Sequence, residues 1–328
     1  MTRKQNLGTK LLIVALGAIL ILSSLIGCVT QKETLTFADL DWDSAQVHNR
    51  IAAFILEHGY GYEIDYIYGS TVPMFIGLVG GDIDISMEIW VENQQEAYDE
   101  AIAAGTIVDL GGNYLDNWQG WLVPTYMIED GDLPADISIE DMPQYWELFK
   151  DPEEPTKGRF YSCIIGWECE MINAEKFSVY GLDDTYNIFE PGTGAALLSS
   201  MVSAYAQGNP WFGYYWSPTP ALGKYDMTPI GEPAYDETVW STNYGCAYPA
   251  VKVNICVNAG LLDRAPDAVE FLENYETTAA IANEALAYME ENDVGAEEAA
   301  IYFLQEYESL WTQWVSADIA SKVKDALP

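Results

Sequence analysis

Residues 81–90 read GDIDISMEIW, in which polar and apolar side chains alternate from Asp82 to Ile89. Successive side chains of a strand point to opposite faces, so this alternation predicts a half-buried strand. The surrounding sequence predicts further strands over 33–40 and 63–68 and helices over 44–58, 70–79 and 92–104. Strands that alternate with helices in this order are typical of an α/β sheet covered by helices.

The remaining chain continues in the same style around a less regular middle. We expect strands near 158–167, 214–216 and 251–258, a helix over 195–206, and helices almost throughout from residue 265 to the end. Acids, prolines and glycines dominate 130–158, which indicates surface loops. A chain of 328 residues is too long for one ordinary core and suits two lobes.

The charge balance limits the possible partners. Acids number 51 and bases 14, which leaves a formal net charge of -37. Such a chain repels nucleic acid and anionic membrane surfaces and attracts cations. Two interpretations of the acidity stay open: an ordinary solvated surface, or adaptation to a salty medium in which self-repulsion is screened.

The N-terminus resembles a bacterial lipoprotein signal. Three bases (Arg3, Lys4 and Lys10) precede the apolar run 11–26, which is short for a membrane span. The run ends in Leu-Ile-Gly-Cys at Cys28, and this ending resembles a lipobox. The resemblance implies cleavage after residue 27, a diacylglycerol on Cys28 and a linker to residue 34. The alternative is an uncleaved anchor helix, and either form leaves the rest of the chain outside the cytoplasm.

Four further cysteines are present, namely Cys163, Cys169, Cys246 and Cys256. An oxidising compartment permits disulfides, but three connectivities and the reduced form all stay open. Zinc is disfavoured because neither a CxxC motif nor a cluster of histidines accompanies them, and the sequence indicates no cofactor.

Aromatic residues are unusually frequent, with 11 Trp, 22 Tyr and 10 Phe beside only 2 His. A quaternary ammonium group has no N–H donors, so hydrogen bonds cannot select it, whereas aromatic faces attract it through the ring quadrupole. An acidic chain rich in tryptophan therefore suits an organic cation. For any single tryptophan, packing in the core is the competing explanation.

An ordered series of segments carries a more specific signal. The series is Trp42-Asp43-Ser44, Gly69 to Met74, Gly81 to Ile85, Glu88-Ile89-Trp90, Gly120 to Tyr126, Gly166-Trp167-Glu168-Cys169, Tyr215 to Pro218 and Arg264 to Asp267. In this order it resembles the glycine betaine/proline betaine/choline-binding proteins of osmoprotectant ABC importers. The likeness covers nearly all of the chain after residue 35.

The resemblance implies an α/β, two-lobed periplasmic-binding-protein-like fold with its ligand in the interlobe cleft. Lobe boundaries are expected at 35–124 with 250–328 for the first lobe and 125–249 for the second, so that the chain crosses twice. The implied partners are a small quaternary-ammonium ligand, a membrane permease and its ATPase. We expect a monomer.

The same resemblance implies the site. Trp90, Trp167 and Trp216 match walls of an aromatic box around a trimethylammonium group, and ligands of open α/β sheets bind beyond strand ends. Trp42 matches a wall of choline-binding members, with Asp43 as the acid that engages the ligand. Trp121 is a weaker candidate, for which core packing competes.

The opposite end of the ligand is less determined. Backbone N–H groups of Glu168 and Cys169 match the donors that relatives offer to a carboxylate. Gln94 departs from the pattern, because some relatives have a histidine four residues after the first box tryptophan. An inward Glu168 side chain would disfavour betaine and favour a pure cation, whereas an outward one would leave only its backbone relevant.

An enzyme is a poorer match to this sequence. His48 and His58 lie on one predicted helix, where His48 is expected at the surface, and no GxSxG, HExxH or GxxxxGK[ST] motif is present. Asp82 and Asp84 share one strand face and are expected to face solvent. The same fold would also suit a ligand sensor for a receptor, or a carrier of another zwitterion or amino acid.

Overall fold

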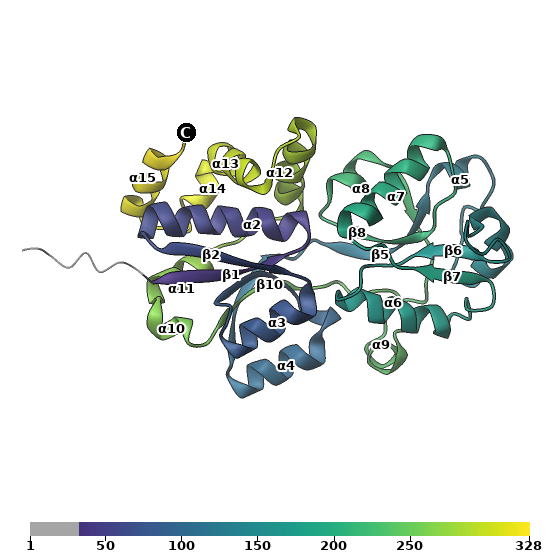
Figure 1. The fold of residues 1–328 in the computed structure, drawn as a ribbon, viewed down its shortest axis with the longest axis horizontal. Helices are drawn as coiled ribbons and strands as arrows, with labels where there is room; N and C mark the ends of the chain where they lie inside the picture. The colour runs from purple at the N-terminus through teal and green to yellow at the C-terminus, as the bar shows by residue number, and fades with distance from the viewer. Residues whose placement is uncertain (1–32) are drawn as a thin grey trace, which may run out of the picture. The chain divides into compact units, whose positions relative to one another are not determined.

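Two five-stranded sheets organise residues 33–328, the part of the chain that the computed structural model describes (Figure 1). Their strand orders are β2-β1-β3-β10-β4 and β7-β6-β8-β5-β9. Helices cover both faces of each sheet, which confirms the expected two-lobed α/β architecture. We call the first sheet with its helices lobe 1 (residues 33–114 and 253–328) and the second lobe 2 (residues 118–243).

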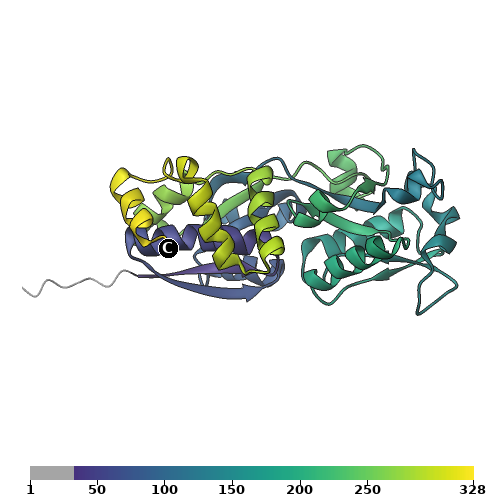
Figure 2. The same cartoon turned by 90° about the horizontal axis from the view of Figure 1, so that it is seen from above.

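Both ends of the described chain belong to lobe 1 (Figures 1 and 2). Its parallel strands β1, β2 and β3 are followed by β4 and by β10, which runs antiparallel to both of its neighbours. The strands are Thr34–Leu40, Glu63–Gly69, Ile85–Trp90, Ile107–Tyr114 and Val253–Asn258. The main helices are α2 Asp43–Phe54, α3 Thr71–Gly80, α4 Gln95–Ala104, α11 Pro266–Glu273, α12 Ala279–Asn292, α13 Ala296–Glu306 and α15 Ala317–Ala326.

Lobe 2 repeats the mixed pattern with shorter strands. They are β5 Trp118–Pro124, β6 Gly158–Tyr161, β7 Tyr186–Phe189, β8 Gly213–Ser217 and β9 Met227–Pro229. The main helices are α6 Glu168–Val179, α7 Gly194–Gln207, α8 Pro220–Lys224 and α9 Glu237–Asn243. The chain enters through 115–117 and returns through 244–252. The boundary expected at residue 124 lies too late, because β5 pairs with β8 and β9 in the second sheet.

The strand that the sequence marks first is more deeply buried than expected. All six residues of β3 are buried, because β3 lies inside its sheet and helices cover both faces. Asp84, expected to face solvent, is 5% exposed and pairs with the guanidinium of Arg264. Asp82 is exposed, as expected. An alternating sequence therefore does not show that its polar side chains face solvent, because both faces of this strand are covered.

The first helix also departs from its predicted end. The helix α2 continues as a π-helix over Ile55–Tyr60 and stops at Gly61, whose φ of 82° lies in the left-handed region that glycine tolerates. Gly59 directly follows the expected end at residue 58, and it lets the chain approach Ile319 of α15, because a Cβ there would lie 2.7 Å from the Ile319 Cγ2. His48 is also not at the surface: it is 1% exposed.

The expected signal peptide and the lipidated Cys28 lie outside the described residues. Within residues 33–328, no helix combines the length and the apolar character that crossing a bilayer requires.

Candidate functional site

A cavity of about 440 Å³ lies between the two lobes. Lobe 1 lines it with residues of β3, of the β1–α2 and β3–α4 connections and of the start of α3. Lobe 2 lines it with residues of β8 and around the start of α6. The lining residues are Trp42, Thr71, Glu88, Trp90, Asn93, Gln94, Trp167, Glu168, Cys169, Tyr214 and Trp216. No lysine or arginine is among these described residues.

Four tryptophans meet in this cavity, and each stands where a strand or helix begins or ends. Trp42 and Trp167 are the N-cap residues of α2 and α6, Trp90 ends β3, and Trp216 is the penultimate residue of β8. The Trp167 ring meets the Trp42 ring edge-on, with 5.5 Å between centroids, and the Trp216 ring edge-on, with 5.1 Å. The four expected box residues are therefore brought together from four separate segments.

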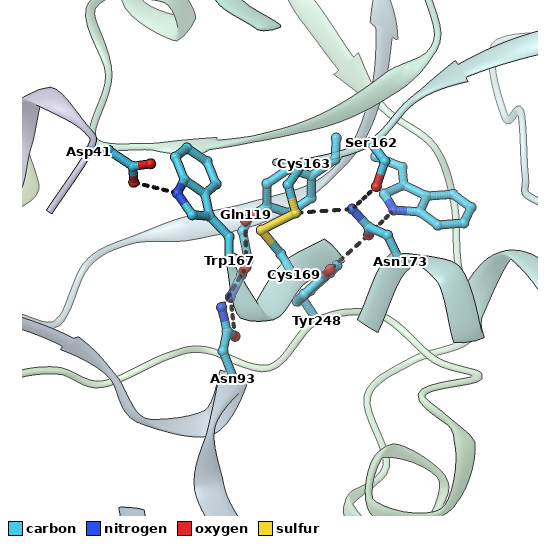
Figure 3. The surroundings of a disulfide bond; sticks show 11 residues. Asp41, Asn93, Gln119, Ser162, Cys163, Trp167, Cys169, Asn173 and Tyr248 are labelled. Carbon is cyan, nitrogen blue, oxygen red and sulfur yellow. Dashed lines mark hydrogen bonds between the residues drawn. A yellow bond between two sulfur atoms is a disulfide. The ribbon is translucent and has the colours of Figure 1, made fainter. Parts of the chain in front are cut away.

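Carboxylates of lobe 1 accept the indole N–H groups of three walls. The Glu88 Oε2 accepts from Trp42 Nε1 at 2.8 Å and from Trp90 Nε1 at 3.3 Å. Asp41 Oδ1 accepts from Trp167 Nε1 at 2.5 Å, and this hydrogen bond joins the lobes (Figure 3). Burial raises the pKa of the Asp41 and Glu88 carboxyls, and the indole hydrogen bonds lower it by a smaller amount.

The sequence alone did not assign Glu88 a role in the site. There it is one of the polar residues of an alternating strand and part of the family-like series. A signal was nevertheless present in the sequence. Residues two apart in a strand share a face, so Glu88 and Trp90 had to point the same way. If Trp90 faces a ligand, Glu88 faces the same region.

A disulfide and further hydrogen bonds also fix the lobe 2 side of the cavity and link it to lobe 1. A disulfide between Cys163 and Cys169 closes the turn that carries Trp167 (Figure 3), which decides among the pairings left open; Cys246 and Cys256 are free and buried. Across the cleft, the side-chain amides of Asn93 and Gln119 donate to each other at 3.3 and 2.9 Å. The Tyr214 hydroxyl donates to the same Gln119 oxygen at 2.8 Å.

The start of α6 faces the cavity with Glu168 and Cys169. The first N–H groups of a helix have no intrahelical acceptor, so they can bind an anionic group. The Glu168 side chain is half-buried and lines the cavity. Burial raises the pKa of Glu168, and the negative charge of Glu170 raises it further.

Two candidates from the sequence lie elsewhere. Asp43 lines a second cavity of about 530 Å³, which shares Trp42 and Trp216 with the first. Trp121 lies in the core of lobe 2, where it is 1% exposed, donates to Asn173 Oδ1 at 2.7 Å and packs on Phe160. Neither residue lines the box cavity. For Trp121, core packing is what the structure shows.

Comparison with known proteins supports the family that the sequence resembles. Residues 33–306 match the family model described as the substrate binding domain of ABC-type glycine betaine transport systems. The chain is 22% identical over 286 residues to the trimethylamine N-oxide-binding protein of Pelagibacter ubique (strain HTCC1062), which covers 86% of this chain and 90% of that protein.

Solved structures share the fold. One is an ABC-transporter choline binding protein in complex with choline, with a TM-score of 0.74 and 20% identity over 90% of this chain and 98% of that one. Another is the glycine betaine, L-proline ABC transporter binding protein from Borrelia burgdorferi, with a TM-score of 0.72 and 18% identity over 88% of this chain and 99% of that one.

Proposed function

This chain belongs to the family of substrate-binding domains of ABC-type glycine betaine transport systems, and from that premise we propose that it captures a small methylated ammonium compound in the cavity between its lobes. The observation that carries the proposal is the meeting of Trp42, Trp90, Trp167 and Trp216 around one cavity. The candidate cargoes are glycine betaine, proline betaine and choline. Trimethylamine N-oxide joins them because one relative is named for it.

The physical basis is the attraction between a cation and aromatic faces. Each desolvated contact of this kind contributes about 0.5–2 kcal/mol. Micromolar affinity needs about 8 kcal/mol, so four contacts reach it only at the top of that range. Carboxyls near the cavity, Glu88 and Glu168, supply a further attraction for positive charge.

For a zwitterionic cargo, the backbone N–H groups of Glu168 and Cys169 are the proposed donors to its carboxylate. Trp42 is a proposed wall of the box, and Asp43, in the adjoining cavity, is proposed to act on approaching cations rather than on the bound one. No bond of the cargo is made or broken in this proposal. The closed protein hands the cargo to a permease driven by an ATPase.

The proposed setting is outside the cytoplasm. Cleavage before Cys28 and lipidation of its sulfur would tether the chain to the membrane, and the chain would work as a monomer. Mass spectrometry of the membrane-extracted protein would detect the diacylglycerol on Cys28, and a Cys28→Ala variant that stays membrane-bound after processing would contradict the anchor.

Calorimetric titration of the protein starting after Cys28 tests the cargo. We expect micromolar binding of at least one of glycine betaine, proline betaine, choline and trimethylamine N-oxide. The double variant Trp90→Ala/Trp216→Ala should lose at least about 100-fold in affinity, because two cation–π walls are removed. Trp118→Ala, a partly exposed tryptophan outside the cavity, is the matched control and should bind normally. A folded protein that binds none of the four compounds would overturn the proposal.

A further inference from the structure

Glu88 is the most deeply buried charged group of the cavity. Its residue is 1% exposed, and it stands in β3, where all six residues are buried. The Oε2 accepts the two indole N–H groups of Trp42 and Trp90, whereas the Oε1 has no hydrogen-bond partner among the described residues. The Oε1 therefore lacks a hydrogen bond of normal geometry at the wall of the cavity, although the hydroxyls of Ser44 and Tyr114 lie close to this carboxyl.

The surroundings of Glu88 contain hydroxyls and rings, and no cation among the described lining residues. Ser44 of α2 and Tyr114 of β4 lie beside the carboxyl, and neither hydroxyl makes a hydrogen bond of normal geometry within the described chain. Burial raises the pKa of Tyr275, which follows α11, and the Glu88 charge raises it further. Its hydroxyl meets His48 Nδ1 at 2.7 Å, and burial lowers the pKa of His48 to about 3, so that His48 is neutral at ordinary pH.

A buried carboxylate without a compensating positive charge is unfavourable, because the protein interior solvates it poorly. Among the described residues that line the cavity, the other charged side chain is Glu168, another acid. Without a partner such a carboxyl is driven toward its protonated form, and only a cation bound in the cavity would favour the ionised form, because the described lining supplies none. A trimethylammonium head enclosed by Trp42 and Trp90 would lie on the wall that Glu88 forms with them.

We propose that Glu88 is the counter-charge of the bound cationic head and that it makes the site selective for positive charge as distinct from trimethyl shape. The proposal rests on the proposed function and deepens it, since it assigns charge recognition to a side chain that touches both lobe 1 walls. Aromatic faces and shape alone would accept a neutral tert-butyl group in the same box. An ionised Glu88 would reward only the charged head.

The test compares each cargo with its carbon isostere, in which a tert-butyl group replaces the trimethylammonium group. The pairs are choline with tert-butylethanol and glycine betaine with tert-butylacetate. In Glu88→Gln, the amide oxygen can still accept from the two indoles, and the amide N–H groups can reach the hydroxyls of Ser44 and Tyr114. The box therefore keeps its walls while the charge disappears.

We expect Glu88→Gln to weaken choline or glycine betaine binding about 10- to 100-fold and to change isostere binding by less than about threefold. The matched control is Glu96→Gln, which removes an exposed acid of α4 outside the cavity lining and should cost less than about threefold, because solvent screens it. Equal losses for cargo and isostere would mean that Glu88 only positions the tryptophans. An unchanged cargo affinity would also overturn the proposal.

A second measurement uses the wild-type protein alone and so does not depend on how the variant folds. Burial raises the pKa of Glu88, so acid protonates it and removes the counter-charge. As the pH falls through the raised pKa of Glu88, affinity for choline should fall while affinity for the isostere stays level. Glu168 faces the same cavity, and the Glu168→Gln variant should keep the slope. A flat choline profile would contradict the proposal.

The two levels of failure are separable. If the wild type binds no quaternary ammonium compound, the proposed function fails and the role of Glu88 fails with it. If the wild type binds one but Glu88→Gln leaves the ratio of cargo to isostere unchanged, only the role of Glu88 fails.

Discussion

Glu88 of lobe 1 and Glu232 of lobe 2 are both buried beside aromatic rings, but among the described residues only Glu232 has a cationic side chain as its partner. In lobe 2, the Glu232 carboxylate pairs with Lys176 Nζ at 2.6 Å, and Lys176 is fully buried. The Lys176 ammonium lies 4.8 to 5.9 Å from the ring centroids of Tyr248, Tyr180, Trp121 and Trp240. Lobe 2, together with Tyr248 of the returning segment, therefore encloses a cation between aromatic rings and an acid.

In lobe 1, Glu88 has the rings of Trp42 and Trp90 but no lysine or arginine with it in the described cavity lining. The presence of Lys176 beside Glu232, and of no lysine or arginine beside Glu88 in the described lining, distinguishes a structural site from a binding site. An aromatic enclosure that contains its own cation is complete and stabilises the fold, whereas one that lacks it is stabilised by a ligand. Variants in both lobes can break or sharpen this contrast.

The largest effect is expected from removing the internal cation. Lys176→Met leaves Glu232 buried without its partner, which should destabilise the protein by about 3–5 kcal/mol. Urea unfolding of the ligand-free protein measures it. Exposed Lys224 pairs with Glu290 at 2.7 Å, and Lys224→Met should leave the free energy of unfolding nearly unchanged, because solvent screens the pair. Similar losses in both variants would remove the contrast between buried and exposed pairs.

The disulfide of lobe 2 is expected to have the next effect. Cys163→Ser/Cys169→Ser opens the short loop that carries Trp167 and should lower the free energy of unfolding by about 2 kcal/mol. Cargo affinity should fall as well, because Trp167 is then held less firmly. Thermal denaturation and titration of the variant measure the two effects. If affinity is unchanged, the loop geometry does not depend on the disulfide.

The link between the lobes is tested at Asp41. Asp41→Ala removes the acceptor of the Trp167 indole across the cleft and should reduce cargo affinity about tenfold, mainly through faster dissociation. Stopped-flow kinetics separate the two rate constants. The matched control is Asp43→Ala in the adjoining cavity, expected to change the dissociation rate less than about twofold. A larger effect of Asp43 would restore the role that the family resemblance implied for it.

The smallest effect concerns Glu88 without ligand. Because its folded-state pKa is raised, the carboxyl contributes most favourably below its ordinary pKa, and that contribution is lost as pH rises through the folded pKa. Glu88→Gln should therefore be as stable as the wild type at neutral pH or more stable by up to about 1 kcal/mol, with the advantage vanishing in acid. Saturating choline should reverse the order. Melting temperatures with and without choline provide the check.

Much of the site followed from sequence order. Trp90 and Trp216 were expected at strand ends, where they lie, and both line the cavity with Trp42. Trp167 lines it too, but the strand expected over 158–167 ends at Tyr161, and Trp167 is the N-cap of α6. The periodic pattern also placed β1, β2 and α3 within a few residues of their observed bounds. Trp121 shows the limit of such reasoning, because a tryptophan beside a strand-like motif can equally enter the core.

The sequence by itself determined the elements, the two-lobed α/β class and the set of tryptophans, because these depend on local periodicity and on motif order. Tertiary structure decided which polar side chains are buried. Asp84 and His48 were expected at the surface, and Glu88 had no assigned role. Each is buried because a covering helix, strand or salt-bridge partner comes from a distant part of the chain. Burial depends on what packs on both faces of an element, and only the assembled sheets and helices supply the second face.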